Sequence, residues 1–174
     1  MIDTIVLGLG GNVGGDDAVL ARMRAVRDAV AAWGGVRASA VYRTAPIGPA
    51  QPDFLNAALA IDARPAPTPR ELIENVQELE RLLGRARELE ARWGPRPIDI
   101  DVLVWGARVI DLPGPPWLRV PHPSLAERRF ALAPLIDLVG EDAVLPGDGR
   151  PLRVCWDTLS DQRVELTGLL LAEG

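Results

Sequence analysis

Apolar and polar positions along the first third of the chain predict three strands and one helix. Residues 2–9 form an almost continuous apolar run, which is typical of a buried strand. Residues 36–43 alternate between apolar and polar positions, and residues 54–61 form a further apolar segment, so both are predicted to be strands. Over residues 16–33, apolar side chains recur every three or four positions, which predicts an amphipathic helix.

The pattern then repeats with a second helix and a fourth strand. Thr68 has the character of an N-cap, followed by Pro69 at the first helical position and Glu71 at the third, and the helix is predicted to continue to about Leu83. A run rich in Ile, Val and Leu predicts a strand over residues 99–105.

The predicted order β-α-β-β-α-β indicates an α+β fold of the ferredoxin-like type. Such a fold has an antiparallel sheet with two helices on one face. We expect residues 107–174 to add accessory elements to this core, including a helix over residues 130–139, a loop over residues 142–150 and a short helix or strand over residues 154–159. The whole chain, residues 1–174, is therefore predicted to be a single domain.

Composition excludes several classes of function. The chain has 174 residues, 48% of them hydrophobic and 25% charged, with a net charge of −5, which argues against a general nucleic-acid partner. It contains no lysine, so a lysine-bearing phosphate loop is excluded. No apolar stretch approaches the roughly 20 residues of a membrane span, and no basic residue precedes the first apolar run, so we expect no signal peptide. We expect a cytoplasmic monomer with no membrane partner.

Two carboxylates in the strand over residues 99–105 suggest a metal site. Asp99 and Asp101 lie two positions apart, so both point to one face of a strand. Neighbouring like charges are costly unless a cation neutralises them, and Mg²⁺ commonly takes one or two protein carboxylates together with substrate phosphates. The alternative is that this face is exposed, or that the carboxylates pair with nearby arginines.

Four arginines precede this strand, and their planar guanidinium groups suit phosphate oxygens. They are Arg85, Arg87, Arg92 and Arg96. A solvated loop or a set of structural ion pairs explains the same spacing equally well. Taken with the two aspartates, the arginines suggest a magnesium–nucleotide enzyme.

Three further features have both a structural and a functional interpretation. The glycines at positions 8 and 10 are not followed by the glycine that a dinucleotide-binding turn needs, because that position is Val13, so we interpret them as a tight turn that a ligand can approach. His122, the single histidine, is either structural or donates a hydrogen bond to a phosphate. Phe54 and Asn56 either belong to the core or recognise a flat heterocycle.

Six segments in a fixed order carry a resemblance to a known family. They are 7–14, 42–48, 51–57, Glu80 with Gly84, Arg85 and Arg87, 93–96 with Asp99 and Asp101, and 121–123 with Arg128 and Phe130. Together they resemble the 6-hydroxymethyl-7,8-dihydropterin pyrophosphokinases of folate biosynthesis. The resemblance implies the same ferredoxin-like fold and covers roughly residues 4–155.

The resemblance also implies an activity and a set of site residues. Enzymes of this family transfer the terminal pyrophosphoryl unit of ATP to the hydroxymethyl group of a reduced pterin, giving AMP and the pterin diphosphate. The implied metal ligands for two Mg²⁺ ions are Asp99 and Asp101, and the implied catalytic set adds Arg85 and Arg96. The implied ATP-binding residues are Gln77, Glu80, Arg85, Arg87, Trp93, Arg96, His122 and Arg128. The implied pterin-binding residues are Thr44, Ala45, Ile47, Phe54, Asn56, Trp93 and Phe130.

Two other functions fit parts of the sequence. A nucleotide-sugar transferase would also use two aspartates with a divalent metal, but such domains are usually longer and have parallel strands. A ferredoxin-like binding or regulatory module without catalysis would not need both aspartates and the arginines. A metal-dependent assay for AMP formation distinguishes these alternatives from the pyrophosphokinase.

Overall fold

The computed structural model describes residues 4–89 and 93–171. Its strands are β1 (Ile5–Gly11), β2 (Gly34–Ala38), β3 (Ala40–Thr44), β4 (Phe54–Ala63), β5 (Asp99–Trp105), β6 (Ile110–Leu112), β7 (Leu118–Val120) and β8 (Val164–Leu170). Its α-helices are α1 (Asp16–Val30), α2 (Pro69–Leu82), α3 (Arg129–Val139) and α4 (Leu152–Asp157), and short 3-10 turns span Ala31–Trp33, Arg87–Leu89 and Leu125–Glu127. The predicted β-α-β-β-α-β order is confirmed.

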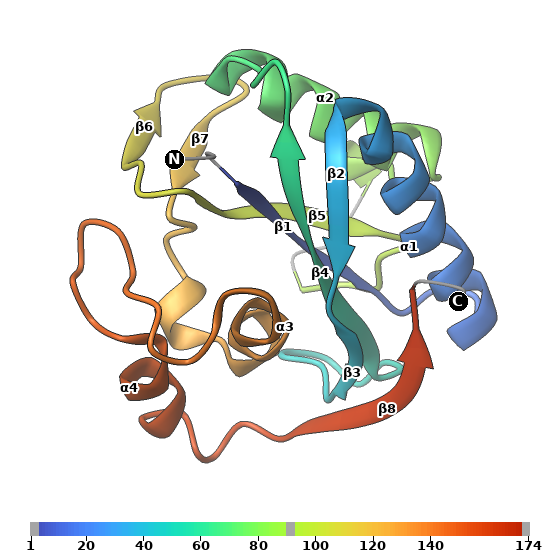
Figure 1. Ribbon diagram of the computed structural model, residues 1–174. Helices are drawn as coiled ribbons and strands as arrows, with labels where there is room; N and C mark the ends of the chain where they lie inside the picture. The colour runs from blue at the N-terminus through green and yellow to red at the C-terminus, as the bar shows by residue number, and fades with distance from the viewer. Residues whose placement is uncertain (1–3, 90–92, 172–174) are drawn as a thin grey trace.

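The central sheet is antiparallel, as predicted, and runs in the order β5-β1-β4-β3-β8 (Figure 1). Strand β2 also pairs with β4, so the predicted strand over residues 36–43 is in fact two strands that share one neighbour. They separate at Ser39, whose hydroxyl accepts the N–H of Ala58 at 2.8 Å while its own N–H donates to the Ala58 carbonyl at 2.9 Å. The strand is interrupted at Ser39, but the N–H and carbonyl groups of Ala58 in β4 both keep hydrogen-bond partners.

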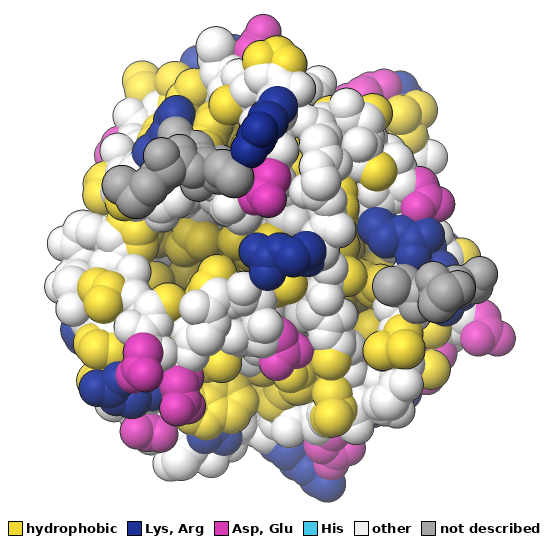
Figure 2. Space-filling model, in the orientation of Figure 1, with side chains coloured by type: hydrophobic (Ala, Val, Ile, Leu, Met, Phe, Trp, Pro, Cys, Tyr) yellow, Lys and Arg dark blue, Asp and Glu magenta, His cyan; other side chains and the backbone are white. Residues whose placement is uncertain are grey.

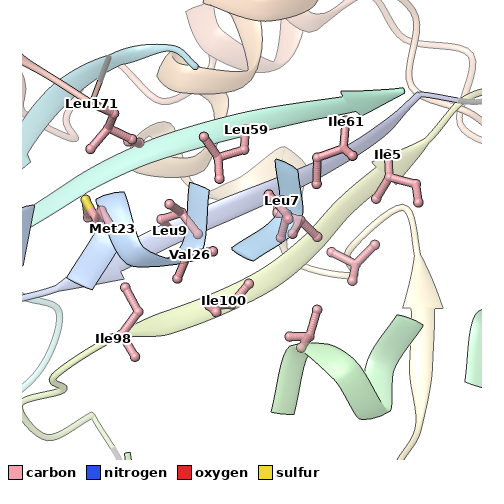
Figure 3. Packing of buried hydrophobic residues seen from close by; sticks show 14 of the residues in the cluster. Ile5, Leu7, Leu9, Met23, Val26, Leu59, Ile61, Ile98, Ile100 and Leu171 are labelled. Atoms are coloured by element: carbon pink, nitrogen blue, oxygen red, sulfur yellow. The ribbon is translucent and has the colours of Figure 1, made fainter. Parts of the chain in front are cut away.

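One face of the sheet is covered by α1 and α2, and most of the core lies there. Figure 3 shows how Leu7 of β1, Leu59 of β4 and Ile100 of β5 gather with Met23 and Val26 of α1 in a single apolar layer. All five side chains are at most 2% exposed. Burial of this layer is the main force that holds the two helices on the sheet.

The opposite face carries α3 and leaves part of the sheet uncovered. Val6 of β1 and Ala58 of β4 pack with Leu132 and Leu135 of α3. Because side chains alternate along a strand, the next position of β1 on this face is Gly8, which has no side chain to fill the space. A hollow therefore remains beside the start of α3.

The C-terminal part of the chain adds elements that the hydrophobic pattern did not predict. The hairpin of β6 and β7 lies beside β5 and α2, and β8 extends the main sheet next to β3 (Figure 1). Arg24 and Arg27 of α1 donate to the carbonyl groups of Leu170 and Leu171, which ties the end of β8 to the first helix. The described part of this segment, residues 107–171, is thus packed against the core.

Two further observations concern the helices and the surface. Within the described part of the chain, no helix is long and apolar enough to cross a membrane. On the face seen in Figure 2, arginines and acidic side chains are interspersed and do not gather into one basic patch.

Local capping explains where α2 begins, and it predicts a stability effect. The Thr68 hydroxyl accepts the N–H of Glu71 at 3.2 Å, and the Glu71 carboxylate accepts the N–H of Thr68 at 2.7 Å. We expect Thr68→Ala to lower the free energy of unfolding by about 1 kcal/mol, because the Glu71 N–H loses the hydroxyl that accepts its hydrogen bond. Urea denaturation measures this loss, and Thr68→Ser, which keeps the hydroxyl, should retain most of the stability. An equal loss in both variants would contradict the capping explanation.

Candidate active site

A cavity of about 490 Å³ lies on the α3 side of the sheet. Its floor is formed by Gly8 and Gly10 of β1, and Asp99 and Asp101 of β5 line one side. On the other side of the floor, β4 and β3 contribute Asn56 and other polar and aromatic groups. The volume is in the range of pockets that hold small-molecule ligands.

Asp99 is held by two arginines that come from the connection between α2 and β5. Its two carboxylate oxygens form separate ion pairs, one with Arg85 and one with Arg96. Burial by itself would raise the pKa of Asp99, but Arg85 and Arg96 outweigh it and hold the pKa below its ordinary value. Asp99 is therefore ionised at neutral pH.

Arg85 is buried, and Glu80 of α2 is its second partner. The side chains of Arg85 and Glu80 are 4% and 1% exposed. Glu80 also accepts hydrogen bonds from Arg87, at 2.8 Å and 2.5 Å, and from the Ile100 N–H at 2.8 Å. Burial raises the pKa of Glu80, while Arg85 and Arg87 oppose that rise. Glu80 thus joins the end of α2, the arginine-bearing loop and β5 at one buried point.

The carboxylate of Asp101 behaves differently from that of Asp99. Its burial and the nearby charge of Asp99 raise its pKa to about 7. The His122 Nε2 atom lies 3.8 Å from the Asp101 Oδ1 atom. Two neighbouring carboxylates with pKa values displaced in opposite directions mark this edge of the cavity as a candidate functional centre.

His122 is positioned to act as a hydrogen-bond donor. The Ser124 N–H donates to His122 Nδ1 at 3.2 Å, so in the neutral ring the proton lies on Nε2, which faces Asp101. Burial and the charge of Arg128 lower the pKa of His122. The ring is therefore neutral near pH 7 and presents one N–H to the cavity.

The side of the cavity opposite the carboxylates suits a flat, polar ligand. The Asn56 amide is 5% exposed and donates to the Thr44 hydroxyl at 2.8 Å, which fixes its orientation. A Cβ atom at Gly10 would lie 3.2 Å from the Asn56 Oδ1 atom, so glycine leaves room for this amide. Phe54 and Phe130 also line the cavity, and the Arg128 guanidinium lies 5.7 Å from the centre of the Phe130 ring.

Two loops that line the cavity are joined through Asn12 and Gln51. The Asn12 side chain accepts the Arg96 N–H at 2.9 Å and donates to Gln51 Oε1 at 3.0 Å and to the Pro52 carbonyl at 2.9 Å. Gln51 in turn donates to the Trp93 carbonyl at 2.7 Å, and Trp93 has a φ of 64°. These contacts hold the loop that carries Trp93 and Arg96 against the loop of residues 45–53.

Gly48 is needed where these loops touch. Its φ is +112°, and an added Cβ would lie 2.8 Å from the Trp93 Cβ atom. A side chain at this position would be strained and would push the loops apart.

The structure brings together most of the residues predicted from the sequence. Those that line the cavity are Thr44, Ala45, Ile47, Phe54, Asn56, Arg85, Arg87, Trp93, Arg96, Asp99, Asp101, His122, Arg128 and Phe130. Gln77 is not among the lining residues, and Glu80 lies behind Arg85 and Arg87 as their partner. Arg92, the fourth arginine predicted to suit phosphates, lies outside the described residues.

Several lining or supporting residues were not predicted from the sequence. Trp117, Pro123 and Ser124 line the cavity, and Asn12 and Gln51 connect its loops. Asn12 and Gln51 both belong to segments that carry the family resemblance, and that was the available signal. Nothing in the local pattern singles out Trp117.

A larger cluster of metal-binding side chains is not present in the part of the chain that the structure describes. Among residues 4–89 and 93–171, no three His, Cys, Asp or Glu side chains are grouped so that they could hold a metal ion. The two aspartates of β5 are the acidic side chains that line the cavity.

Comparison with known proteins gives one matching family model and several similar proteins. The family model described as 7,8-dihydro-6-hydroxymethylpterin-pyrophosphokinase matches residues 6–140. A relative from Methylorubrum extorquens is 45% identical over 147 residues, covering 82% of this chain and 85% of the relative. A relative from Bacillus subtilis is 38% identical over 133 residues, covering 76% of this chain and 75% of the relative. Both relatives are named 2-amino-4-hydroxy-6-hydroxymethyldihydropteridine pyrophosphokinase.

Solved structures support the fold. The wild-type HPPK-DHPS of Plasmodium falciparum matches with a TM-score of 0.67 at 15% sequence identity, covering 91% of this chain and 41% of that one. A second structure of that protein, with pteroate, matches with a TM-score of 0.67 at 13% identity and covers 42% of its chain. This chain therefore spans about two fifths of the length of these structural relatives.

The buried ion pair of Glu80 predicts a stability difference between two positions of α2. We expect Glu80→Gln to lower the free energy of unfolding by about 3 kcal/mol, because the buried Arg85 guanidinium loses the negative charge of a buried partner. Glu78→Gln is the matched control on the same helix, since Glu78 and its partner Arg81 are both more than half exposed. Urea denaturation of both variants measures the difference, and equal midpoints would show that the buried network does not stabilise the fold.

Proposed function

The chain belongs to the 7,8-dihydro-6-hydroxymethylpterin-pyrophosphokinase family, and from that premise we propose that its cavity transfers the pyrophosphoryl group of ATP to 6-hydroxymethyl-7,8-dihydropterin. The products are AMP and the pterin diphosphate. The observation that carries the proposal is the arrangement of one cavity, in which two neighbouring carboxylates and four arginines face an amide and two phenylalanine rings. A binding module without catalysis would not require the charged half of this site.

The two aspartates of β5 fit a magnesium site. They lie on one face of the strand and line the same cavity, where burial and the charge of Asp99 raise the pKa of Asp101 to about 7. Mg²⁺ prefers one or two protein carboxylates, with phosphate oxygens and waters as its other ligands. Asp99 and Asp101 would hold two such ions, and the bound metal would neutralise phosphate charge and make the pterin hydroxyl more acidic.

The arginines and His122 hold the triphosphate. Arg85 is fixed by Glu80 and Asp99, so its guanidinium is oriented before the nucleotide arrives. Arg96 and Arg87 approach from the same loop region and add positive charge at the cavity wall. The Nε2–H of His122 donates a hydrogen bond to a phosphate oxygen. Transfer of phosphoryl groups depends mainly on such positioning and charge stabilisation.

The pterin binds across the floor from the carboxylates. The Asn56 amide, oriented by Thr44, recognises the polar edge of the ring, and Phe54 and Phe130 cover its two faces. Ala45, Ile47 and Trp93 border the cavity from the two loops that Asn12 and Gln51 join. Closure of these loops would exclude water, which otherwise competes with the pterin hydroxyl for ATP.

The proposal is tested by AMP formation. In the presence of Mg²⁺, ATP and 6-hydroxymethyl-7,8-dihydropterin, we expect pterin-dependent release of AMP that falls by about 100-fold or more in Asp101→Asn. Asp111→Asn is the matched control, because the Asp111 side chain is 70% exposed on the β6–β7 hairpin. Near-native turnover in Asp101→Asn would contradict the metal assignment, and no AMP from the folded wild type would contradict the proposed reaction.

The pKa of Asp101 predicts how binding of Mg·ATP depends on pH. With a pKa of about 7 in the free protein, Asp101 is protonated below that pH and cannot ligate a metal. We expect the affinity for Mg·ATP to be about tenfold lower at about pH 6 than at about pH 8, because binding must then release the proton. Calorimetry at the two pH values measures the change. Asp101→Asn should show a flatter dependence, and an unchanged slope in that variant would assign the titration to another group.

A further inference from the structure

Trp117 is a large aromatic side chain of the cavity with no role in the site described above. It lines the cavity together with Arg87 and His122, and 60% of its surface is exposed. It directly precedes Leu118, the first residue of β7, which is 4% exposed and belongs to the main core. The indole is thus attached to a buried strand and leaves most of its surface accessible.

The loop before Trp117 is held in place by the first turn of α2. The Arg70 guanidinium donates to the Pro116 carbonyl at 2.9 Å and to the Pro113 carbonyl at 3.0 Å. An added Cβ at Gly114 would collide with the backbone of Pro116, so this turn is tightly folded. Pro115 and Pro116 have restricted φ angles, and Leu118 lies in the buried strand β7, so the backbone on both sides of Trp117 is held without a ligand.

The elements of the cavity follow an order across the molecule. The β6–β7 hairpin lies beside β5 and α2, whereas β3 lies on the other side of β1 and β4 (Figure 1). Trp117 therefore lies at the β7 end, Asp99 and Asp101 lie on β5, and Asn56 and Thr44 lie beyond the glycine floor. The carboxylates and arginines lie between these two ends of the cavity. Because the proposed function assigns the Asn56 end to the pterin, the base of a nucleotide whose phosphates lie at the arginines extends toward β7.

We propose that Trp117 is the stacking platform for the base of the nucleotide substrate. This inference rests on the proposed function, because it takes the phosphates to lie at Asp99 and the arginines. An indole ring presents a flat apolar face, and every nucleobase has a π-face that stacks on it. Stacking of this kind tolerates different bases, so Trp117 increases affinity for the nucleoside part without selecting adenine.

The test compares binding of Mg·ATP with binding of inorganic tripolyphosphate, which has the same chain of phosphates and no base. We expect the Kd for Mg·ATP, measured by calorimetry, to rise about tenfold in Trp117→Ala, and Trp117→Phe to recover most of the loss. The Kd for tripolyphosphate with Mg²⁺ should change by less than about twofold in either variant. Leu82→Ala, which removes a side chain 63% exposed on α2, is the control for loss of exposed apolar surface.

The pattern of losses across the two ligands distinguishes base stacking from a different role of Trp117. If Trp117→Ala weakens the binding of ATP and of tripolyphosphate equally, Trp117 acts on the phosphate groups through its loop. That result would contradict the proposed stacking of the base. If neither ligand is affected, Trp117 does not contact the nucleotide. Because these are binding measurements, they remain valid if the wild type forms no AMP, an outcome that would contradict the proposed reaction instead.

Discussion

The ion pairs of Arg85 with Glu80 and Asp99 are the contact on which the rest of the site depends. They join the end of α2 to the start of β5 and place a buried cation beside a carboxylate at the cavity wall. A charge so far from water is stable only if its partners are fixed, and Glu80 is fixed in turn by Arg87 and the Ile100 N–H. The same contacts leave Asp99 ionised. Together with burial, the charge of Asp99 raises the pKa of Asp101 to about 7.

The sheet supplies the space for this chemistry through its two different faces. The helices α1 and α2 cover one face with a continuous apolar core, and burial of that core stabilises the fold. On the other face, α3 covers only part of the strands, and the glycines of β1 replace side chains where the cavity begins. Site residues from β1, β4 and β5 can then share one floor although they are far apart in the sequence.

The loops around the cavity are coupled by hydrogen bonds, so they do not move independently. Asn12 and Gln51 connect three segments, and two of these carry Trp93, Arg96 and Ile47. The segment that carries Arg96 is therefore joined by hydrogen bonds to the loop that borders the far side of the cavity.

Local pattern was sufficient for the elements that carry strong periodicity or capping. The strand over residues 99–105 and the start of α2 at Thr68 were both predicted and are both observed, because alternation, capping and proline position act within a few residues. The break at Ser39 and the strands β6, β7 and β8 were not predicted, since short strands are defined by partners that lie far along the chain.

The sequence by itself determined the kinds of groups in the site, and only the tertiary structure decided what each one does. Two aspartates, several arginines and a lone histidine indicate phosphate and metal chemistry by their residue types. Spacing did not distinguish structural ion pairs from ligand contacts, and the fold shows that Arg85 makes structural ion pairs while it also lines the cavity. Likewise, Trp117 joins the cavity only because β7 folds back beside β5, and side-chain roles of this kind depend on distances that no local pattern encodes.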